Sequence, residues 1–360
     1  MLFVFTGLML LSLICGYLMY VRNPGVSTIA KHQLPTVSII IPARDEADKL
    51  PKLLQSIEQQ NIAADVIVVN DGSTDNTAAI AEEFGVRVIH FNNLSDWKGK
   101  TAACYEGTRH AQGELLAFMD ADTWFEDDTS LRRIITSYNQ GLIAIQPYHI
   151  TKHWYEQLSV MFNILTVTGM NIFSIIRPKE NTGAFGPFIL CSYEDYHQTG
   201  GHKGAAGAMI EGFALADHFH DNGLPVTLLL GRGTLNFRMY PHGLRSMIDG
   251  WAKHFATGAT KTLPSVMALI VMWMMGSVTL PLFIIWGGLT TTTHLMIAII
   301  SYLIYSSYFY VISKRTGSFT RVTALLFPVA FFFFIYVFLQ SAYYTFIRKE
   351  VKWKGRRIKF

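Results

Sequence analysis

Three long stretches of this chain carry no charged side chain, and they set the first limit on its fold. Leu2 to Val21, Thr262 to Ser313 and Val322 to Ile347 contain no Asp, Glu, Lys or Arg. A helix of about 20 apolar residues crosses a bilayer, so each stretch is long enough to span, and the second is long enough to span twice. The sequence therefore predicts a membrane protein whose ordinary polar part is Arg22 to Lys261.

The first apolar stretch is predicted to remain on the protein as an anchor. It lacks the basic residues before the apolar run and the small-residue cleavage site of a secretory signal peptide. A buried core helix is the alternative, but such a helix is ordinarily shorter and amphipathic.

The positive charge of the chain is concentrated at its C-terminus. Residues 348–360 hold seven Lys or Arg side chains against one Glu, which gives +6, whereas the whole chain carries +4. The rest of the chain is therefore at −2, and its charge does not predict nucleic-acid binding. A basic tail beside a membrane segment suits anionic lipid head groups; a solvated terminus is the alternative.

Short β-branched runs alternate with helical segments in the polar part. The runs predicted as strands are residues 36–41, 65–69, 86–90 and 115–119, and the segments predicted as helices are residues 49–60, 76–84 and 100–110. This alternation predicts a Rossmann-like α/β domain with a mainly parallel sheet. Ligands of such sheets bind beyond the carboxyl ends of the strands.

Polar clusters directly follow three of the predicted strands, at residues 42–46, 70–75 and 119–122. Their common position predicts one crevice. Asp120 and Asp122 are separated by one residue, so their carboxylates can converge on one cation. Hard oxygen ligands suit Mg²⁺ or Mn²⁺, which in turn can hold a diphosphate.

Other acids near this edge have a simpler interpretation. Neighbouring acids are common in turns and helix caps, and this is the role expected for Asp127 and Asp128 before a helix from Ser130. For Asp71 we favour a ligand role over a turn, because its carboxylate can accept hydrogen bonds from a nucleobase or ribose and Gly72 allows close backbone approach.

Two cations precede the third predicted helix. Lys98 and Lys100 flank Gly99, where a positive charge and free backbone amides can hold a phosphate. The glycine-rich run of a Walker motif is missing, so this is a different kind of phosphate site.

Four of these motifs together carry a resemblance to a known family. Residues 38–46 read SIIIPARDE and residues 69–75 read VNDGSTD; Gly99-Lys100 and Asp120-Ala121-Asp122 follow. Their order and spacing resemble the family 2 glycosyltransferases with the GT-A fold, over about residues 36–256. The resemblance implies an enzyme, a hexosyltransferase that uses a nucleotide-sugar donor and a divalent metal, Mg or Mn.

The resemblance also implies roles for individual residues. Those implied on the donor side are Pro42, Ala43, Arg44, Glu46, Asp71, Lys100 and Asp120, and those implied at the metal are Asp120 and Asp122. Among them, Asp71 would read the base, usually uracil, and Lys100 would lie near the pyrophosphate. Asp122 would take part in catalysis by holding the metal.

Motifs in the second half of the chain narrow the resemblance. They are QPYHI at 146–150, AFGP at 184–187, GGHK at 200–203, IEGFAL at 210–215 and WKGR at 353–356. With the first four they resemble, nearly end to end, the carotenoid glycosyltransferases of staphyloxanthin biosynthesis. This implies UDP-glucose as donor, an apolar polyene carboxylic acid as acceptor and a glucosyl ester of inverted anomeric configuration as product.

The acceptor-side loop departs from the family pattern. Most family 2 enzymes carry Glu-Asp there, with the Asp as general base on an acceptor hydroxyl, whereas Glu211 is followed by Gly212. A carboxylic acid with a pKa of about 4 to 5 is already ionised and needs no base. We therefore hypothesise a carboxylate acceptor, with Glu211 orienting groups around the site and Asp217 as a weaker candidate. The alternative is that Glu211 itself is the base.

An anionic acceptor requires cations near it. His202, Lys203 and Arg245 are candidates, although each also fits an ordinary surface position. Residues 241–261 are predicted as an amphipathic helix with Trp251 on its apolar face; core packing is the alternative, but the position before a membrane stretch favours an interfacial helix that guides a lipid acceptor. The Gln-x-x-Arg-Trp pattern of processive members is not present in that form, which favours a single transfer.

The predicted organisation contains one conflict. The parts are a transmembrane anchor at 1–22, a GT-A catalytic domain at 35–240, an amphipathic interfacial helix at 241–261, a membrane region of two to three spans at 262–347 and a basic tail at 348–360. Cytosolic nucleotide sugars imply a multi-pass protein of the cell membrane with a cytoplasmic catalytic domain. Charge places the tail inside as well, yet four full spans starting outside would put it outside, so one segment must be re-entrant, interfacial or differently counted.

Three other functions stay open. A glycosyltransferase acting on a hydroxyl of a membrane lipid such as diacylglycerol shares every feature except the Gly212 argument. A nucleotidyltransferase would show a glycine-rich phosphate loop after its first strand, which residues 42–46 do not form. A non-catalytic membrane scaffold would function without Asp122.

Overall fold

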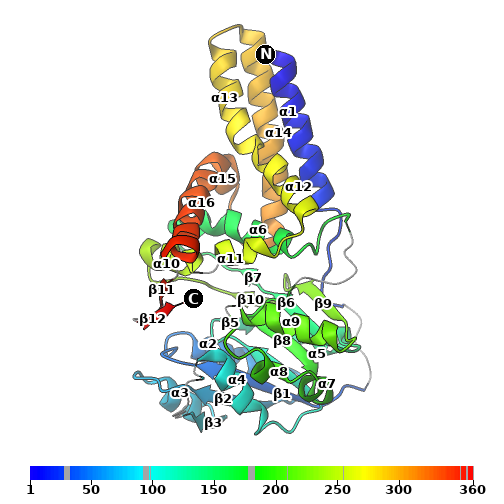
Figure 1. The fold of residues 1–360 in the computed structure, drawn as a ribbon, viewed down its shortest axis with the longest axis vertical. Coiled ribbons are helices and arrows are strands. Elements are labelled where there is room, and N and C mark those ends of the chain that lie inside the picture. Colours follow the sequence, from blue (N-terminus) through cyan, green and yellow to red (C-terminus); the bar gives the residue numbers. More distant parts are fainter. Residues whose placement is uncertain are drawn as a thin grey trace. The chain divides into compact units, whose positions relative to one another are not determined.

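The chain folds into two compact units, which Figure 1 shows in a computed structural model. The helical unit comprises residues 1–23, 149–178 and 239–360, and the sheet unit comprises residues 24–148 and 179–238. The structure describes residues 1–27, 33–91, 97, 99–176, 183–208, 210–253, 255–348, 350–353 and 356–359. Lys98, and Lys354 and Gly355 of the WKGR motif, lie outside the described residues.

A mixed sheet forms the centre of the sheet unit. Its strands are β1 (Val37–Ala43), β2 (Asp65–Asn70), β3 (Arg87–His90), β4 (Leu115–Met119), β6 (Leu142–Gln146), β8 (Phe188–Ser192) and β9 (Val226–Leu230). Their order across the described sheet is β3-β2-β1-β4-β8-β6-β9. β3, β2, β1 and β4 are parallel, whereas β8 runs antiparallel to β4 and β6. The predicted strands and the mainly parallel sheet are confirmed.

The helices of the sheet unit confirm the predicted alternation. The three expected helices are α2 (Leu50–Glu58), α3 (Thr77–Glu83) and α4 (Lys100–Thr108). The other elements are α5 (Ser130–Ser137), α7 (Tyr193–Gln198), α8 (Gly201–Gly204), α9 (Glu211–Asp221), β5 (Thr123–Phe125) and β10 (Leu235–Phe237). β5 and β10 pair antiparallel beside the main sheet.

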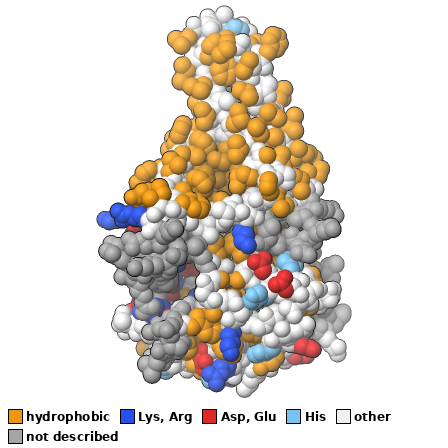
Figure 2. Space-filling model, in the orientation of Figure 1, with side chains coloured by type: hydrophobic (Ala, Val, Ile, Leu, Met, Phe, Trp, Pro, Cys, Tyr) orange, Lys and Arg blue, Asp and Glu red, His pale blue; other side chains and the backbone are white. Residues whose placement is uncertain are grey.

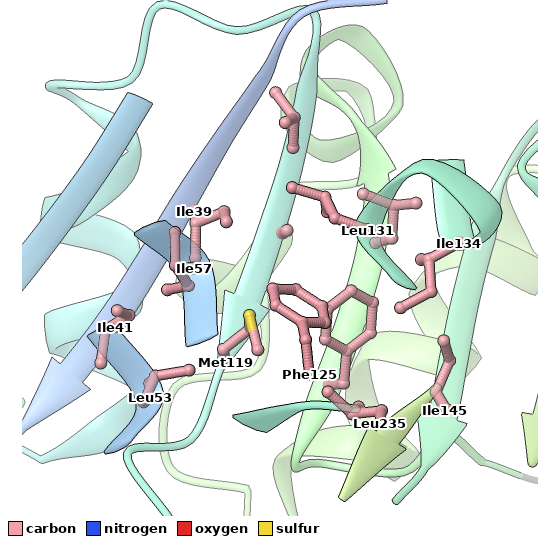
Figure 3. Packing of buried hydrophobic residues seen from close by; sticks show 14 of the residues in the cluster. Ile39, Ile41, Leu53, Ile57, Met119, Phe125, Leu131, Ile134, Ile145 and Leu235 are labelled. Carbon is pink, nitrogen blue, oxygen red and sulfur yellow. The ribbon is translucent and has the colours of Figure 1, made fainter. Parts of the chain in front are cut away.

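The core of this unit lies between the sheet and helices α2 and α5 (Figure 3). α2 places Leu50, Leu53, Leu54 and Ile57 on one face, at the spacing of an amphipathic helix, and all four are buried. From the sheet, Ile39 and Met119 point toward them, and α5 adds further apolar side chains. This packing fixes the carboxyl ends of β1 and β4, where the polar clusters begin.

Asp127 holds the turn before Ser130, but neither Asp127 nor Asp128 caps the helix as expected, because the N-cap residue of α5 is Thr129 and it has no side-chain cap hydrogen bond. Asp127 Oδ1 accepts hydrogen bonds from the backbone N of Thr129 at 3.0 Å and from the Ser130 hydroxyl at 3.0 Å. Asp128 is exposed. Asp127 therefore has a structural role at the start of α5.

Four helices in the described part of the chain are long and apolar enough to cross a membrane. They are α1 (Leu2–Met19), the joined pair α12 (Pro264–Met274) and α13 (Gly276–Gly288), α14 (Thr292–Thr316), and α16 (Phe327–Ala342) with its π-helical extension Tyr343–Arg348. Figure 2 shows apolar side chains covering the outside of the bundle that Figure 1 labels α1, α13 and α14. Phe3 and Ile14 of α1 are 88% and 55% exposed, so α1 does not fit the alternative of a buried core helix.

Shorter helices pack together in the rest of the helical unit. They are η1 (Trp154–Ser159), α6 (Val160–Gly169), α10 (Leu244–Ala252), α11 (Phe255–Thr260) and α15 (Arg321–Leu325), with the short strands β7 (Tyr148–His149), β11 (Glu350–Trp353) and β12 (Arg356–Lys359) completing the described elements. The single helix expected over residues 241–261 is instead α10 and α11. α10 begins only after Gly243, which has a φ of 110° that a helix cannot contain.

The apolar face of α10 packs inside the helical unit. Trp251 stacks on Phe162 of α6 with ring centroids 4.8 Å apart, and Met247 is fully buried against the Ser159 hydroxyl. These contacts match the core-packing alternative for this face. Contact of α10 with a membrane surface stays a prediction.

Candidate active site

The first two polar clusters meet at the carboxyl edge of β1 and β2. The backbone N of Asp71 donates to Ala43 O at 2.9 Å. Arg44 Nη1 lies 3.2 Å from Asp71 O and 3.8 Å from an Asp71 carboxylate oxygen. The backbone N of Thr74 donates to Asp45 Oδ1 at 2.7 Å. Two of the three clusters that predict one crevice therefore form one hydrogen-bonded edge.

Lys100, the first residue of α4, contacts three acceptors. Its Nζ lies 2.7 Å from Asp120 Oδ1, 2.5 Å from Glu211 Oε1 and 3.0 Å from Gly186 O. Burial alone would lower the pKa of Lys100, but the two carboxylates more than offset it and raise the pKa above its ordinary value. The Lys100 ammonium thus ties the end of β4 to the start of α9. The Lys100 and Asp120 side chains remain 29% and 30% exposed, so a ligand can reach them.

Lys49 is a second cation in the crevice, and the sequence motifs did not identify it. Its Nζ lies 2.8 Å from Glu46 Oε2, and its charge also acts on Asp122 and Asp120. Burial, and next the charge of Asp120, raise the pKa of Asp122 to about 7. The available signal was the spacing of Glu46 and Lys49, three residues apart in the turn that precedes α2.

The acidic groups of this cluster outnumber the basic ones. Its carboxylates are those of Glu46, Asp120, Asp122 and Glu211, and its ammonium groups are those of Lys49 and Lys100. With every group ionised, four negative and two positive charges leave an excess of −2. The raised pKa of Asp122 is the electrostatic result of this excess together with burial.

A divalent cation fits the Asp120 and Asp122 end of the cluster. Among the described residues, no three His, Cys, Asp or Glu side chains converge as a closed metal site. Mg²⁺ and Mn²⁺ do not require one, because they bind through one or two carboxylates with substrate phosphates and water. The donor set is therefore suited to an ion that arrives with a diphosphate.

Gly212 is closed to any side chain. A Cβ on this residue would lie 2.1 Å from Ala184 O, which is too close for any atom pair. The backbone N of Ala184 also donates to Gly212 O at 3.0 Å, so the two chain segments are held in direct contact. An aspartate at position 212 would require this backbone to move. The packing against Ala184 therefore requires glycine at the position where most family 2 enzymes have aspartate.

His202 is buried, which contradicts the prediction that it supplies a positive charge to the acceptor. The residue is 1% exposed. Its Nδ1 lies 3.1 Å from Tyr196 Oη, and its backbone N donates to the same oxygen at 3.1 Å. Burial lowers the pKa of His202 to about 4, so the imidazole is neutral at pH 7. His202 belongs to the packing of α8 on Tyr196.

The other expected acceptor residues stay predictions. Lys203 is exposed on α8 and Asp217 is exposed on α9, while Glu211 starts α9 and points to Lys100. Arg245 and Trp251 belong to the helical unit.

Known proteins resemble this chain in sequence. The sequence model for glycosyl transferase family 2 matches residues 38–197. The 4,4'-diaponeurosporenoate glycosyltransferase of Staphylococcus aureus strain N315 is 40% identical over 364 residues, which cover 98% of this chain and 96% of the relative. The protein of the same name from strain MRSA252 is 39% identical over 366 residues, with the same coverage.

A solved structure shares the fold. The mannosyltransferase PcManGT from Pyrobaculum calidifontis, in complex with GDP-Man and Mn²⁺, matches with a TM-score of 0.54 at 16% identity and covers 97% of each chain. This likeness shows the GT-A architecture, and the S. aureus relatives establish the relationship along nearly the whole sequence. The chain is therefore a glycosyltransferase and belongs to glycosyl transferase family 2.

Proposed function

We propose that this enzyme moves glucose from UDP-glucose to the carboxylate of an apolar carotenoid acid and releases a glucosyl ester of inverted anomeric configuration. The name of the S. aureus relatives specifies such an acid, and the identity to them extends over 98% of this chain. The observation that carries the choice of acceptor is the contact between Gly212 and Ala184 O, which leaves no space for an aspartate base.

The donor would bind along the carboxyl edge of β1, β2 and β4. Asp71, held by Arg44, would accept hydrogen bonds from the nucleobase, and Lys100 would offset phosphate charge. Asp120 and Asp122 would hold the divalent metal. When bound, the metal would stabilise the negative charge that develops on the departing diphosphate. The P. calidifontis mannosyltransferase was solved with Mn²⁺, which supports this choice of ion.

The transfer itself would need no general base. A carboxylate oxygen of the acceptor attacks the anomeric carbon while the bond from that carbon to the phosphate oxygen breaks, and the electron pair leaves with UDP. No proton has to be removed, because a carboxylic acid with a pKa of about 4 to 5 is ionised at pH 7. Attack on the face opposite the leaving group inverts the configuration.

Glu211 would act as a positioning residue. Its Oε1 lies 2.5 Å from Lys100 Nζ, and the same ammonium lies 2.7 Å from Asp120. A carboxylate in such a pair loses the interaction when it takes up a proton, so Glu211 is poorly suited to act as a base. The pair also reduces the negative charge that an anionic acceptor would meet.

Acceptor profiling with the purified full chain tests this function. The enzyme is incubated with UDP-glucose, Mn²⁺ and one of three acceptors: 4,4'-diaponeurosporenoate, the corresponding carotenoid alcohol or diacylglycerol. We expect a hexose adduct only on the acid, detected by mass spectrometry and removed by mild alkali as an ester is. Transfer to the alcohol or to diacylglycerol at an equal or higher rate would overturn the carboxylate acceptor and favour a hydroxyl-directed enzyme.

A further inference from the structure

The segment that follows α14 begins on a layer of short helices. We use the word platform for the described residues of 149–169, 244–253 and 255–260, which include η1, α6, α10 and α11. The backbone N of Ser318 donates to His149 O at 2.8 Å, and the backbone N of Thr320 donates to Gln157 Oε1 at 3.0 Å. The segment therefore leaves α14 attached to the platform.

The same segment ends on the same platform. The backbone N of Ala256 in α11 donates to the Ser341 hydroxyl at 3.1 Å, near the end of α16. Phe334 of α16 packs edge to face on Phe162 of α6 and on Phe255 of α11, with ring centroids 5.2 and 5.5 Å apart. The platform is one layer, because Trp251 of α10 donates its indole N–H to the Ser159 hydroxyl at 3.2 Å.

Between these ends the chain reverses beside the middle of α14. α15 ends at Leu325 and α16 begins at Phe327, and Tyr302 Oη donates to Leu325 O at 2.6 Å. Tyr302 precedes the end of α14 at Thr316 by 14 residues, which is about 21 Å along a helix. The hydrocarbon core of a bilayer is about 30 Å thick, so the reversal does not reach its far side.

We infer that residues 318–342 form a re-entrant hairpin that enters the hydrocarbon core of the membrane from one side and returns to the same side, and that α16 is not a transmembrane span. A spanning helix must end on the side opposite to its start, whereas this segment is attached to one platform at both ends. Its outer side carries the apolar residues that lipid acyl chains would cover, each 45% to 64% exposed: Val322, Leu325, Leu326, Val329, Phe332, Tyr336 and Leu339.

The charge distribution agrees with this topology. Arg315 Nη1 at the end of α14 donates to Tyr20 O just after α1 at 2.8 Å, so these two ends lie at the same level. With α1, α12–α13 and α14 as the crossings among the described helices, Arg22, Arg321 and the basic tail all fall on one side. This is the cytoplasmic side by the positive-inside rule. Counting α16 as a fourth crossing would separate the tail from the other basic residues.

Cysteine accessibility of the full chain in intact and permeabilised cells tests the hairpin. The natural cysteines Cys15, Cys104 and Cys191 are buried. Single cysteines are introduced in the sheet unit (Asp128→Cys), between α13 and α14 (Thr291→Cys), before α15 (Arg321→Cys) and in the tail (Lys359→Cys). Each variant is treated with a membrane-impermeant maleimide. Labelling of the parent chain, which holds only the three natural cysteines, is the background.

The hairpin predicts that Thr291→Cys is labelled in intact cells, whereas Asp128→Cys, Arg321→Cys and Lys359→Cys are labelled only after permeabilisation. Labelling of Lys359→Cys in intact cells, with Arg321→Cys still protected, would show that α16 crosses the membrane and would overturn the inference. Protection of Thr291→Cys would equally contradict it, because α12–α13 would then not cross. Labelling does not depend on sugar transfer, so the result is separate from the proposed activity.

Discussion

The two cations of the site differ in the carboxylates that they contact directly. Lys100 forms ion pairs with both Asp120 and Glu211 and also contacts Gly186 O. Lys49 pairs with Glu46 at 2.8 Å, yet Asp122 beside it has its pKa raised to about 7 by burial and by Asp120. Each ammonium with its two carboxylates leaves a charge of −1. The two sides differ because both carboxylates beside Lys100 form ion pairs with it, whereas Asp122 is in no ion pair of the described residues. We therefore propose that the metal binds at Asp122 and that Lys100 connects β4, the Gly186 loop and α9.

The largest effect on sugar transfer is expected from removing the charge of Asp122, the proposed metal ligand. Asp122→Asn keeps the shape of the side chain but removes the charge, and we expect sugar transfer to fall by about 10³-fold, because a metal contributes several kcal/mol to charge stabilisation in the transition state. UDP release with Mn²⁺ measures the loss. Asp128→Asn, the same chemical change at an exposed side chain, is the matched control. An unchanged rate of sugar transfer by Asp122→Asn would show that the metal does not bind at Asp122.

Removal of the Lys100 ammonium should have the next largest effect on sugar transfer. Lys100→Gln leaves Asp120 and Glu211 without the ammonium that now lies 2.7 and 2.5 Å from them. We expect transfer to fall about 10²-fold, because an ion pair loses one partner in a partly buried setting. The double variant Lys100→Gln with Glu211→Gln restores the charge balance and should recover part of the loss. If the double variant is worse than Lys100→Gln alone, the two residues do not act as a pair.

The close packing of Gly212 against Ala184 can be tested by a change in stability. Gly212→Ala places a Cβ where Ala184 O now lies, 2.1 Å away, and we expect a loss of about 1 to 3 kcal/mol in the free energy of unfolding. Thermal unfolding in detergent measures it. Gly258→Ala is the control, because a Cβ there meets no atom within 4 Å. Equal unfolding temperatures for the two variants would contradict the closed packing at Gly212.

The pH dependence of metal binding gives the smallest expected effect. The pKa of Asp122 is raised to about 7 without metal, so a fall in pH from 8 to 6 protonates this carboxylate and a proton then competes with the ion. We expect the apparent affinity for Mn²⁺ to weaken about tenfold over this range. Mn²⁺ titration of the donor-free enzyme by electron paramagnetic resonance checks it. An affinity independent of pH would show that Asp122 is not a ligand.

The sequence was sufficient to predict features that depend on short segments. The strands that became β1 to β4 are short apolar runs, and the polar clusters that follow them lie together because parallel strands present their carboxyl ends at one edge. The motif around Asp120 and Asp122 could therefore be interpreted without knowing the rest of the fold.

Features that depend on contacts between distant segments could not be predicted. Position 212 is closed by the carbonyl of Ala184, 28 residues earlier, and nothing in the sequence reports that contact. His202 is a residue type that often lies at the surface and can carry a positive charge, but here it is buried against Tyr196. Hydropathy predicted that α16 is apolar but not that its segment begins and ends on one platform, because length and composition do not specify the path of a chain.

The rate of transfer as a function of pH tests the central claim most directly. The wild-type enzyme and Glu211→Gln are compared between pH 8 and pH 6 with the carotenoid acid, saturating UDP-glucose and saturating Mn²⁺, so that proton competition at Asp122 does not limit the rate. A carboxylate acceptor that needs no base predicts that both rates stay within about twofold over this range. A wild-type rate that falls about tenfold per pH unit with one ionisation, and a pH dependence that Glu211→Gln abolishes, would contradict the account by showing that Glu211 is a general base.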